Sequence, residues 1–467
     1  MKTLFLPELL YVQGAFIRHG GLLVDDSGKI IDAPIQRDVA ADRVIEFPGK
    51  CLLPGFVNAH SHSFQRLIRG RAESRIVSGK DFWSWRNTMY HAAALLDADN
   101  VFDVARMAFL EMALAGTTTI GEFHYLHLAP NGSPYEDPNL LAKQIISAAR
   151  SVGIRIVLLR TAYIRSGYEL PRDGGQARFF ESADDFLANM ERLTSEDSDD
   201  PQVRFGVAPH SVRAVPLDAI IRIANWARSK SLPIHMHISE QVAENTASVR
   251  EYGCTPITLL HREKLLGPDF TAVHATHVSE SEIATMAQTG ANICACPTTE
   301  RNLGDGVFAA DAAMSAGIPV ALGSDSQAQI DPLEDARELD YHLRLVQQKR
   351  AILDQIAGES LADRLFRCAT RNGARALAIP AGDLKNELMA DFFTVDLDDV
   401  SISGSGDESL LSTIVFSLQR CAIRDVAVGG KLIIENGRHA LQGEIVGRYQ
   451  QVHEKVWKSS HHDRIDR

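Results

Sequence analysis

The chain lacks both a long apolar run and a paired cysteine motif. No stretch of its 467 residues approaches the roughly 20 apolar residues that a transmembrane helix needs, and the apolar part of residues 1–8 is too short for a secretory signal. The six cysteines are scattered, and none forms a Cys-x-x-Cys pair. Scattered cysteines are typical of a reducing compartment, so we expect a cytoplasmic protein with no membrane partner.

Positive charge is also scarce, because 48 Lys and Arg face 60 Asp and Glu, which gives a formal net charge of −12. This sign argues against nucleic acid and anionic membrane surfaces as partners. If the substrate is an anion, the site must therefore supply its own arginines. The length and the 45% of hydrophobic residues fit a globular protein with one large barrel and a smaller companion domain.

Both ends of the chain carry short β-type segments separated by turns. These segments are residues 20–31, 44–49, 390–396 and 423–437. Neither end has enough strands to bury a core alone, so we expect the two ends to form one small β-sandwich domain. The predicted parts of this domain are residues 1–55 and 376–440, and residues 441–467 are expected to form a C-terminal helix and tail.

Between these ends, over residues 56–375, strand-like and helical runs alternate. The strand-like runs are the segment that ends at His60–His62 and residues 117–120, 155–159, 204–208, 232–237, 271–274, 292–296 and 319–323. Eight such units predict the α/β class and a TIM-like (β/α)8 barrel. The chemistry of such barrels lies where strands end and loops begin.

Metal-ligand residues stand at several of these strand ends. His60 and His62 are two residues apart, so both imidazoles point to the same side of a strand and can chelate a divalent cation. For this pair alone, two histidines bound to backbone partners are the alternative. His237 after the fifth strand and Asp325 after the eighth complete the predicted ligand set. His235 has the parity of His237 but lies deeper, and we interpret it as core.

Acid–base residues follow the same strand ends. Glu240 comes three residues after His237 and can hydrogen-bond both a water and a leaving nitrogen. His274 ends the sixth strand and can polarise the substrate, whereas His277 is interpreted as an outer, structural histidine. Asp325 can accept a proton as well as bind the metal. The predicted catalytic residues are therefore Glu240, His274 and Asp325.

This set of residues resembles the amidohydrolase superfamily, in its one-metal deaminase branch, over essentially the whole chain. Two-metal relatives carry a bridging lysine at the end of the fourth strand, and residues 206–213 contain none. The resemblance therefore implies one divalent ion per chain, Zn²⁺ or alternatively Fe²⁺. A narrower resemblance to the formimidoylglutamate deiminase family rests on residues 60–66, 82–90, 122–125, 210–215 and 302–306. Among these, Phe-Trp-x-Trp-Arg and Glu-Phe-His-Tyr are not expected in related nucleobase deaminases.

The narrower resemblance implies hydrolysis of N-formimino-L-glutamate to N-formyl-L-glutamate and ammonia, a step of histidine degradation. It implies His60, His62, His237 and Asp325 as ligands, and it implies a substrate pocket lined by Gln65, Arg86, Tyr125, His210 and Arg213. The substrate is a small dianion, and each of the two arginines can hold a carboxylate in a bidentate fork. A surface position is the alternative for Arg86.

The chain departs at two places from the sequence pattern of familiar members of this family, and two alternative functions stay open. Gln327 stands where we expect a histidine, and Glu300 with Arg301 adds a charge pair near the pocket, so either could shift the substrate. The first alternative function is deamination of an aminopurine or a guanidine-like compound on the same site. The second is a catalytically silent barrel in an assembly, which predicts a missing ligand. We expect a homodimer.

Overall fold

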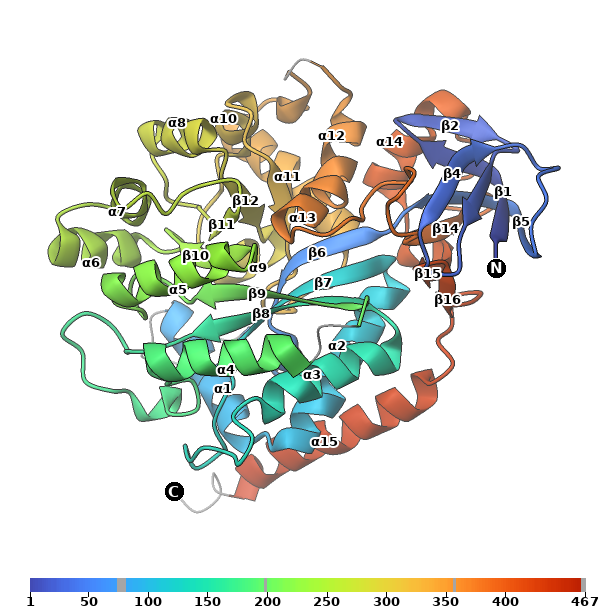
Figure 1. The fold of residues 1–467 in the computed structure, drawn as a ribbon. Coiled ribbons are helices and arrows are strands. Elements are labelled where there is room, and N and C mark those ends of the chain that lie inside the picture. The colour runs from blue at the N-terminus through green and yellow to red at the C-terminus, as the bar shows by residue number, and fades with distance from the viewer. Residues whose placement is uncertain (74–80, 197–199, 356–357, 463–467) are drawn as a thin grey trace.

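The computed structural model describes residues 1–73, 81–196, 200–355 and 358–462. Two β-sheets organise the chain (Figure 1): a central barrel with helices around it, and a smaller sheet at one side in which the first and last strands of the chain lie together. Residues 463–467 of the predicted tail and the side chains of residues 82–84 lie outside the described part.

Eight parallel strands in chain order form the barrel. They are β6 (Phe56–Ser61), β7 (Thr117–His124), β8 (Arg155–Ala162), β9 (Val203–Pro209), β10 (Ile234–Ile238), β11 (Phe270–His274), β12 (Asn292–Ala295) and β13 (Val320–Leu322). The backbone closes the ring, because His62 N–H donates to Asp325 O at 3.0 Å and Asp325 N–H donates to His60 O at 3.1 Å. Closure therefore places the first predicted ligand segment against the last.

Helices follow the barrel strands, and some of them begin with a side-chain cap. They are α1 (Asp81–Leu95), α2 (Ala98–Leu114), α3 (Leu140–Val152), α4 (Ala183–Glu196), α5 (Leu217–Ser229), α6 (Val242–Tyr252), α7 (Pro256–Arg262), α8 (Glu280–Thr289), α9 (Pro297–Leu303), α10 (Ala310–Ser315), α11 (Pro332–Gln347), α12 (Leu361–Cys368) and α13 (Arg371–Ala376), with single 3-10 turns at η1 (Ser63–Ile68), η2 (Gly174–Gln176) and η3 (Ile352–Gln355). A capping box of Ser279 and Glu282 starts α8, and Gly290 at φ +75° ends it. The predicted (β/α)8 barrel is confirmed.

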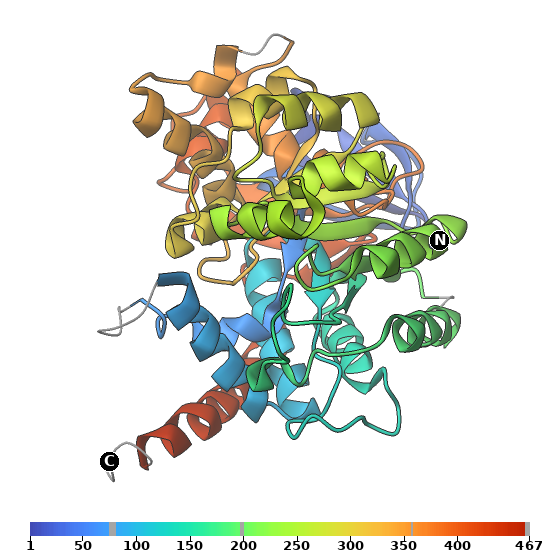
Figure 2. The same cartoon turned by 90° about the vertical axis from the view of Figure 1, so that its left-hand side faces the viewer.

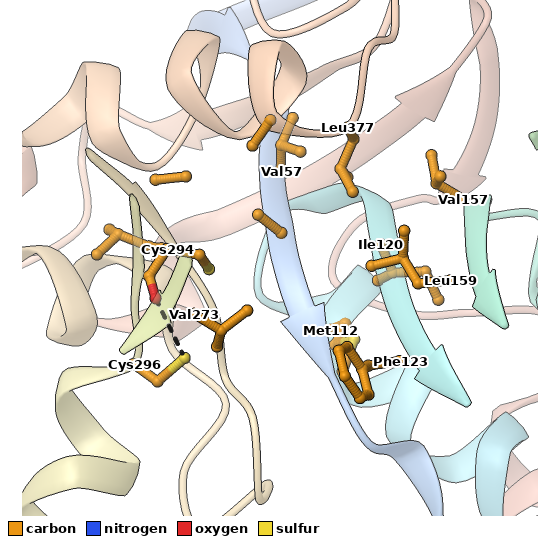
Figure 3. Packing of buried hydrophobic residues seen from close by; sticks show 14 of the residues in the cluster. Val57, Met112, Ile120, Phe123, Val157, Leu159, Val273, Cys294, Cys296 and Leu377 are labelled. Carbon is orange, nitrogen blue, oxygen red and sulfur yellow. Dashed lines mark hydrogen bonds between the residues drawn. The ribbon is translucent and has the colours of Figure 1, made fainter. Parts of the chain in front are cut away.

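The barrel interior below the ligand segments is packed with apolar side chains (Figure 3), among them Val57, Ile120, Val157 and Leu377. Cys294 and Cys296 lie in the same buried cluster, and burial raises the pKa of the Cys296 thiol well above its usual range. Both cysteines are therefore part of the packed core.

The small sheet joins the two chain ends. Its strands are β1 (Thr3–Val12), β2 (Ala15–Arg18), β3 (Gly21–Val24), β4 (Ile30–Ile35), β5 (Arg43–Pro54), β14 (Phe392–Asp396), β15 (Ile423–Val428) and β16 (Lys431–Ile434). The antiparallel pairing of β5 with β14 makes the junction, and the Phe5 and Phe392 rings meet edge to face at 5.0 Å in its core. The predicted association of the chain ends is confirmed, whereas the domain boundaries stay predictions.

Gly55 connects this sheet directly to the barrel, between β5 and β6. A Cβ at this position would lie 2.3 Å from the Thr118 side chain of β7, so only glycine allows the two strands to approach. The connection positions β6, and with it His60 and His62, rigidly at the start of the barrel.

Two further helices follow: α14 (Asp407–Ser417), which precedes the turn η4 (Arg420–Ala422), and α15 (Gln442–His462). Helix α15 lies along α2, where Arg106 pairs with Glu444 at 2.9 Å, and both views show its far end away from the small sheet (Figures 1 and 2). The predicted C-terminal helix is confirmed. Within the described residues, no helix combines the length and the apolar character needed to cross a membrane.

Candidate metal centre and substrate pocket

Four buried side chains meet at the C-terminal ends of the barrel strands. His60 of β6, His62 directly after it, His237 of β10 and Asp325 after β13 each place one donor atom in a group whose members lie within 4.8 Å of one another. The three Nε2 atoms are 3.2 to 3.4 Å apart. Asp325 Oδ1 lies 3.3 Å from His60 Nε2 and 3.2 Å from His62 Nε2. The predicted ligands are therefore brought together.

The spacing of these atoms fits a tetrahedral divalent ion. Nitrogen ligands about 2.05 Å from an ion, at tetrahedral angles, lie about 3.3 Å from one another. His62 Nδ1 donates to Phe123 O at 2.8 Å and His237 Nδ1 donates to His210 O at 3.2 Å, so the Nε2 lone pairs face the group. Burial lowers the pKa of His60 to about 3, and it lowers the pKa of His237 well below the usual range. Facing lone pairs of neutral imidazoles repel one another unless a cation lies between them.

Glu122 of β7 is a buried carboxylate that fixes the ligand segment. Ser61 Oγ donates to its Oε2 at 2.6 Å, and the Ser63 N–H and Oγ donate to its Oε1 at 2.7 and 2.6 Å. The residue after it, Phe123, accepts the hydrogen bond from His62. Glu122 and Phe123 therefore hold His62 from both sides, which explains part of the Glu-Phe-His-Tyr segment.

Gln327 belongs to the same support and does not line the substrate pocket. Its side chain is fully buried, and its Nε2 donates to Ser61 Oγ at 2.9 Å and to Asp325 O at 2.8 Å. Gln327 thus links the two ligand segments that close the barrel.

Left-handed backbone conformations gather at these strand ends. The non-glycine residues concerned are Ser239, His274, Ala275, Asp325 and Gln327, with φ from +45° to +69°. Each such conformation costs roughly 1 to 3 kcal/mol and persists only where the surroundings impose it. The sharp turns take the side chains at the ends of β11 and β13 out of the regular alternation of a strand.

Two carboxylates flank His274. Its Nε2 lies 4.0 Å from Glu240 Oε1, and its Nδ1 lies 3.3 Å from Glu300 Oε1, which also accepts from the Cys296 N–H at 2.9 Å. Burial raises the pKa of Glu240, although His274 opposes the shift. Burial would lower the pKa of His274, but Glu240, Glu300 and Asp325 outweigh it and raise that pKa well above its usual range. A carboxyl with a raised pKa suits proton transfer near neutral pH.

The sequence predicts that the charges of Glu300 and Arg301 both lie near the pocket. For Arg301 this prediction is wrong. Glu300 is buried behind His274, whereas Arg301 pairs with Glu338 and donates to Gln329 at 3.1 Å. Consecutive residues of a helix point about 100° apart, so only the first of the two faces the site.

Three of the four donor residues, His62, His237 and Asp325, line one pocket. Its lining residues are His62, Gln65, Trp85, Arg86, Met89, Tyr90, Tyr125, Tyr163, Phe179, His210, Arg213, His237, Glu240, His274, Leu303 and Asp325. All five predicted substrate-binding residues are among them, and Gln65 Nε2 donates to the Tyr125 hydroxyl at 2.7 Å. Predicted ligands, acid–base residues and substrate residues thus share one cavity.

Arg213 brings a positive charge to this pocket, and Glu244 and Glu240 act on it only at longer range. Its side chain is partly buried, and it makes no hydrogen bond or ion pair with any described residue. The Arg165 guanidinium holds the loop by donating to Arg213 O and Val212 O, both at 3.0 Å. A partly desolvated cation that faces a cavity without a partner suits an anionic ligand.

Comparisons with known proteins agree with this site. A model of the amidohydrolase family matches residues 51–433. The formimidoylglutamate deiminase of Pseudomonas aeruginosa is 34% identical over 97% of this chain and 99% of its own length. The 5-methylthioadenosine/S-adenosylhomocysteine deaminase of Pyrococcus abyssi is 26% identical, over 91% and 92%. The crystal structure of an amidohydrolase from Brucella melitensis superposes with a TM-score of 0.89 at 30% identity, over 97% and 99%. The chain belongs to the amidohydrolase family.

For this amidohydrolase, the predicted family, fold class and type of reaction, hydrolysis of a C–N bond, are confirmed. His235 is buried, and its Nε2 lies 2.8 Å from Ala376 O, as expected of a core residue. His277 Nε2 lies 2.7 Å from Asp305 O, outside the donor group. The roles of the individual site residues stay predictions.

Several side chains at the site of the amidohydrolase are not predicted from the sequence. Tyr163 lines the pocket and directly follows β8, so the rule of strand ends could have found it. Phe179 lies in the long segment between β8 and α4, which has no periodic pattern and gives no signal. Glu122 and Glu300 stand in segments that the sequence singles out, but their contacts with Ser61 and His274 join parts of the chain that the sequence does not pair.

Proposed function

We propose that this amidohydrolase hydrolyses the formimino group of N-formimino-L-glutamate to give N-formyl-L-glutamate and ammonia, a step of histidine degradation. The observation that carries the proposal is the Arg213 cation, which has no ion pair with a described residue and lies in the pocket that Glu240 and three of the four donor residues also line. The chain has a net charge of −12, so a dianion needs this local positive charge. The similarity to the deiminase of Pseudomonas aeruginosa supports the same substrate.

The donor set suits a single zinc ion, with Fe²⁺ as the second choice. Three neutral imidazoles and one carboxylate are ligands that Zn²⁺ prefers, and the donor atoms have a tetrahedral spacing. When bound, such an ion lowers the pKa of a water molecule from 15.7 to about 7.

Glu240 is the proton carrier in this proposal. It removes a proton from the water that attacks the formimino carbon, and it delivers a proton to the terminal nitrogen, which leaves as ammonia. Its position 4.0 Å from His274 lets the imidazole polarise the same substrate group. Glu300 holds the His274 ring from the opposite nitrogen. Asp325 Oδ2 lies 3.8 Å from His274 Nε2 and offers a second proton acceptor.

Substrate binding falls to the remaining pocket residues. Arg213 and Arg86 bind the two carboxylates as bidentate forks. Tyr125 accepts a hydrogen bond from Gln65 and can donate its own O–H to the substrate. His210 lies beside His237, with ring centroids 4.8 Å apart, and forms the wall next to the reacting group.

The alternative function is deamination of an aminopurine derivative on the same donor group. The similarity to the deaminase of Pyrococcus abyssi favours it as the second candidate. A catalytically silent barrel predicts a missing ligand, and all four predicted ligand residues are present and adjacent. The homodimer stays a proposal.

A substrate panel tests the proposal. Zinc-loaded protein is incubated with formiminoglutamate, with adenosine, with 5-methylthioadenosine and with guanine, and the released ammonia is measured. We expect a kcat/KM for formiminoglutamate at least about a hundredfold above every purine, because one well-placed charged contact is worth a factor of about ten to a hundred. Preference for a purine would contradict the proposal and support the alternative.

A further inference from the structure

Two tyrosines of the pocket share a single glutamine. Gln176 Nε2 of η2 donates to the Tyr90 hydroxyl of α1 at 2.6 Å and to the Tyr163 hydroxyl at 2.8 Å. The Gln176 side chain is buried, with 1% of its surface exposed, and its Oε1 has no partner among the described residues. A carboxamide nitrogen has two N–H groups, so both are used by the two phenols.

This arrangement fixes the direction of both tyrosine hydroxyls. Since each phenolic oxygen accepts a hydrogen bond from Gln176, its own O–H is left to donate elsewhere. Both rings line the pocket and Gln176 does not, so the pocket is the direction that remains open. Burial raises the pKa of Tyr90, which keeps this phenol protonated and able to donate.

Two arginine side chains lie near the Tyr90 and Tyr163 hydroxyls. The Arg86 guanidinium carbon lies 5.3 Å from the centre of the Tyr90 ring. Arg213 interacts electrostatically with both tyrosines and, at longer range, with Glu244 and Glu240, and its guanidinium makes no hydrogen bond with a described residue. Two guanidinium groups and two neutral O–H donors offer many hydrogen-bond donors at one end of the pocket. A carboxylate, with four acceptor positions, is the group that such a set binds best.

The segment that carries Gln176 is held in place before any ligand binds. Asp173 Oδ1 accepts from the Gly175 N–H at 2.9 Å, and the Phe179 N–H donates to Gln176 O at 2.9 Å. The Phe179 ring then packs against Tyr90 and Tyr163, with centroids 5.8 and 5.6 Å away. A preorganised donor set binds an anion without the cost of ordering side chains.

The His210 ring contacts a metal ligand as well as Tyr163 of the tyrosine pair. The His237 and His210 rings are 4.8 Å apart, and the His210 and Tyr163 rings are 4.6 Å apart. A substrate that reaches from the donor group to the tyrosines must therefore be elongated, with its reacting carbon at one end and its anionic group at the other.

We propose that Tyr90, Tyr163 and Gln176 form, together with Arg213, a carboxylate subsite that selects acyclic amidines with a carboxylate on the chain. The inference rests on the proposed function and deepens it, because it names the group of the substrate that the pocket recognises. Gln176 acts as a positioning residue, and the two tyrosines contact the carboxylate.

Three conservative variants test the subsite: Tyr163→Phe, Tyr90→Phe and Gln176→Glu. Phenylalanine removes one donor. Glutamate matches the shape of glutamine but only accepts, so it captures both O–H groups and adds a negative charge. Matched controls are Tyr341→Phe on α11, whose ring packs on Phe416 away from the pocket, and Gln288→Glu at an exposed position of α8. All proteins are compared at equal zinc content. The melting temperature of each variant is measured first, and a value equal to that of the wild type shows that the variant is folded.

Two readouts are measured. The first is the hydrolysis of formiminoglutamate and of N-butylformamidine, an amidine without a carboxylate. We expect Tyr163→Phe and Tyr90→Phe to raise the KM for formiminoglutamate about tenfold, and Gln176→Glu to raise it more than about a hundredfold, with kcat changed less than about threefold. The kinetics of N-butylformamidine and both control variants should not change. The second readout is calorimetric binding of glutarate, which should weaken by the same factors.

Equal losses for both amidines would overturn the inference, because the tyrosines would then shape the pocket without recognising a carboxylate. Unchanged KM values in all three variants would overturn it as well. If the wild-type protein does not hydrolyse formiminoglutamate, the proposed function fails, and glutarate binding decides the subsite separately. Weaker glutarate binding in the variants then supports the subsite, and unchanged binding contradicts it.

Discussion

Replacing Arg213 with Met removes the pocket cation that has no partner in the described structure. The side chain is partly buried and forms no ion pair with a described residue. Burial would lower the pKa of Arg213, but Tyr163, Glu244, Tyr90 and Glu240 act on the cation at longer range and raise it. A charge-assisted bidentate contact to a carboxylate contributes roughly 1.5 to 3 kcal/mol. We therefore expect Arg213→Met to lower kcat/KM for formiminoglutamate by roughly tenfold to more than a hundredfold, mainly through KM.

The same variant should change the melting temperature only slightly, because the guanidinium makes no hydrogen bond or ion pair with a described residue and loses only longer-range attraction to Glu244 and Glu240. Steady-state ammonia release and thermal unfolding measure the two effects. Arg250→Met at an exposed position of α6 changes the net charge equally and serves as the control. Wild-type kcat/KM in Arg213→Met, or a large loss of stability with an unchanged KM, would refute the reasoning that Arg213 is kept for an anionic substrate.

Further predictions concern the metal ligands, the proton carrier and their supports. Elemental analysis should find about one divalent ion per chain, and Asp325→Ala should lose all but a trace of turnover, so two tightly held ions or an active variant would contradict the ligand set. Glu240→Gln should keep the ion but lose about 10² to 10⁴ in kcat, and loss of the ion instead would make Glu240 a ligand. Glu122→Gln should weaken metal affinity by roughly 10- to 100-fold in a chelator competition, because it holds both neighbours of His62, and unchanged affinity would show that this support is dispensable. Burial raises the pKa of Glu244 to about 7. Between about pH 4.5 and 7 its carboxyl is therefore protonated in the folded protein and ionised in the unfolded protein. The free energy of unfolding should therefore fall as the pH rises from about 4.5 to 7, by at most about 3 kcal/mol. In denaturant titrations at several pH values, Glu244→Gln should show a smaller fall. An equal fall in the variant would exclude Glu244 as its source.

Much of the barrel and the donor group could be predicted because their signals are local. A two-residue spacing on a strand puts His60 and His62 on one side whatever surrounds them, and the rule of strand ends then adds His237 and Asp325. The sequence did not predict which side chains of the helix after β12 point toward the site. Glu300 and Arg301 are adjacent in sequence, but only Glu300 faces His274. A sequence without known helix phase cannot distinguish the two.

The supports of the site could not be predicted, because they join elements distant in the chain. Gln176 bonds to Tyr90, which is 86 positions earlier, and Gln327 bonds to Ser61, which is 266 positions earlier. Such contacts depend on how the barrel closes and on where long loops return, and neither leaves a periodic pattern in the sequence. The carboxylate subsite therefore becomes visible only in three dimensions.

The most direct test of the account is a proton NMR time course of zinc-loaded protein with N-formimino-L-glutamate. The account predicts that the formimino proton signal is replaced by the formyl proton signal of N-formyl-L-glutamate, with one ammonia released per substrate, and that the Glu240→Gln protein with equal zinc content does neither. An unchanged formimino signal with the fully metal-loaded wild-type protein, or release of glutamate and formamide in place of ammonia, would contradict it.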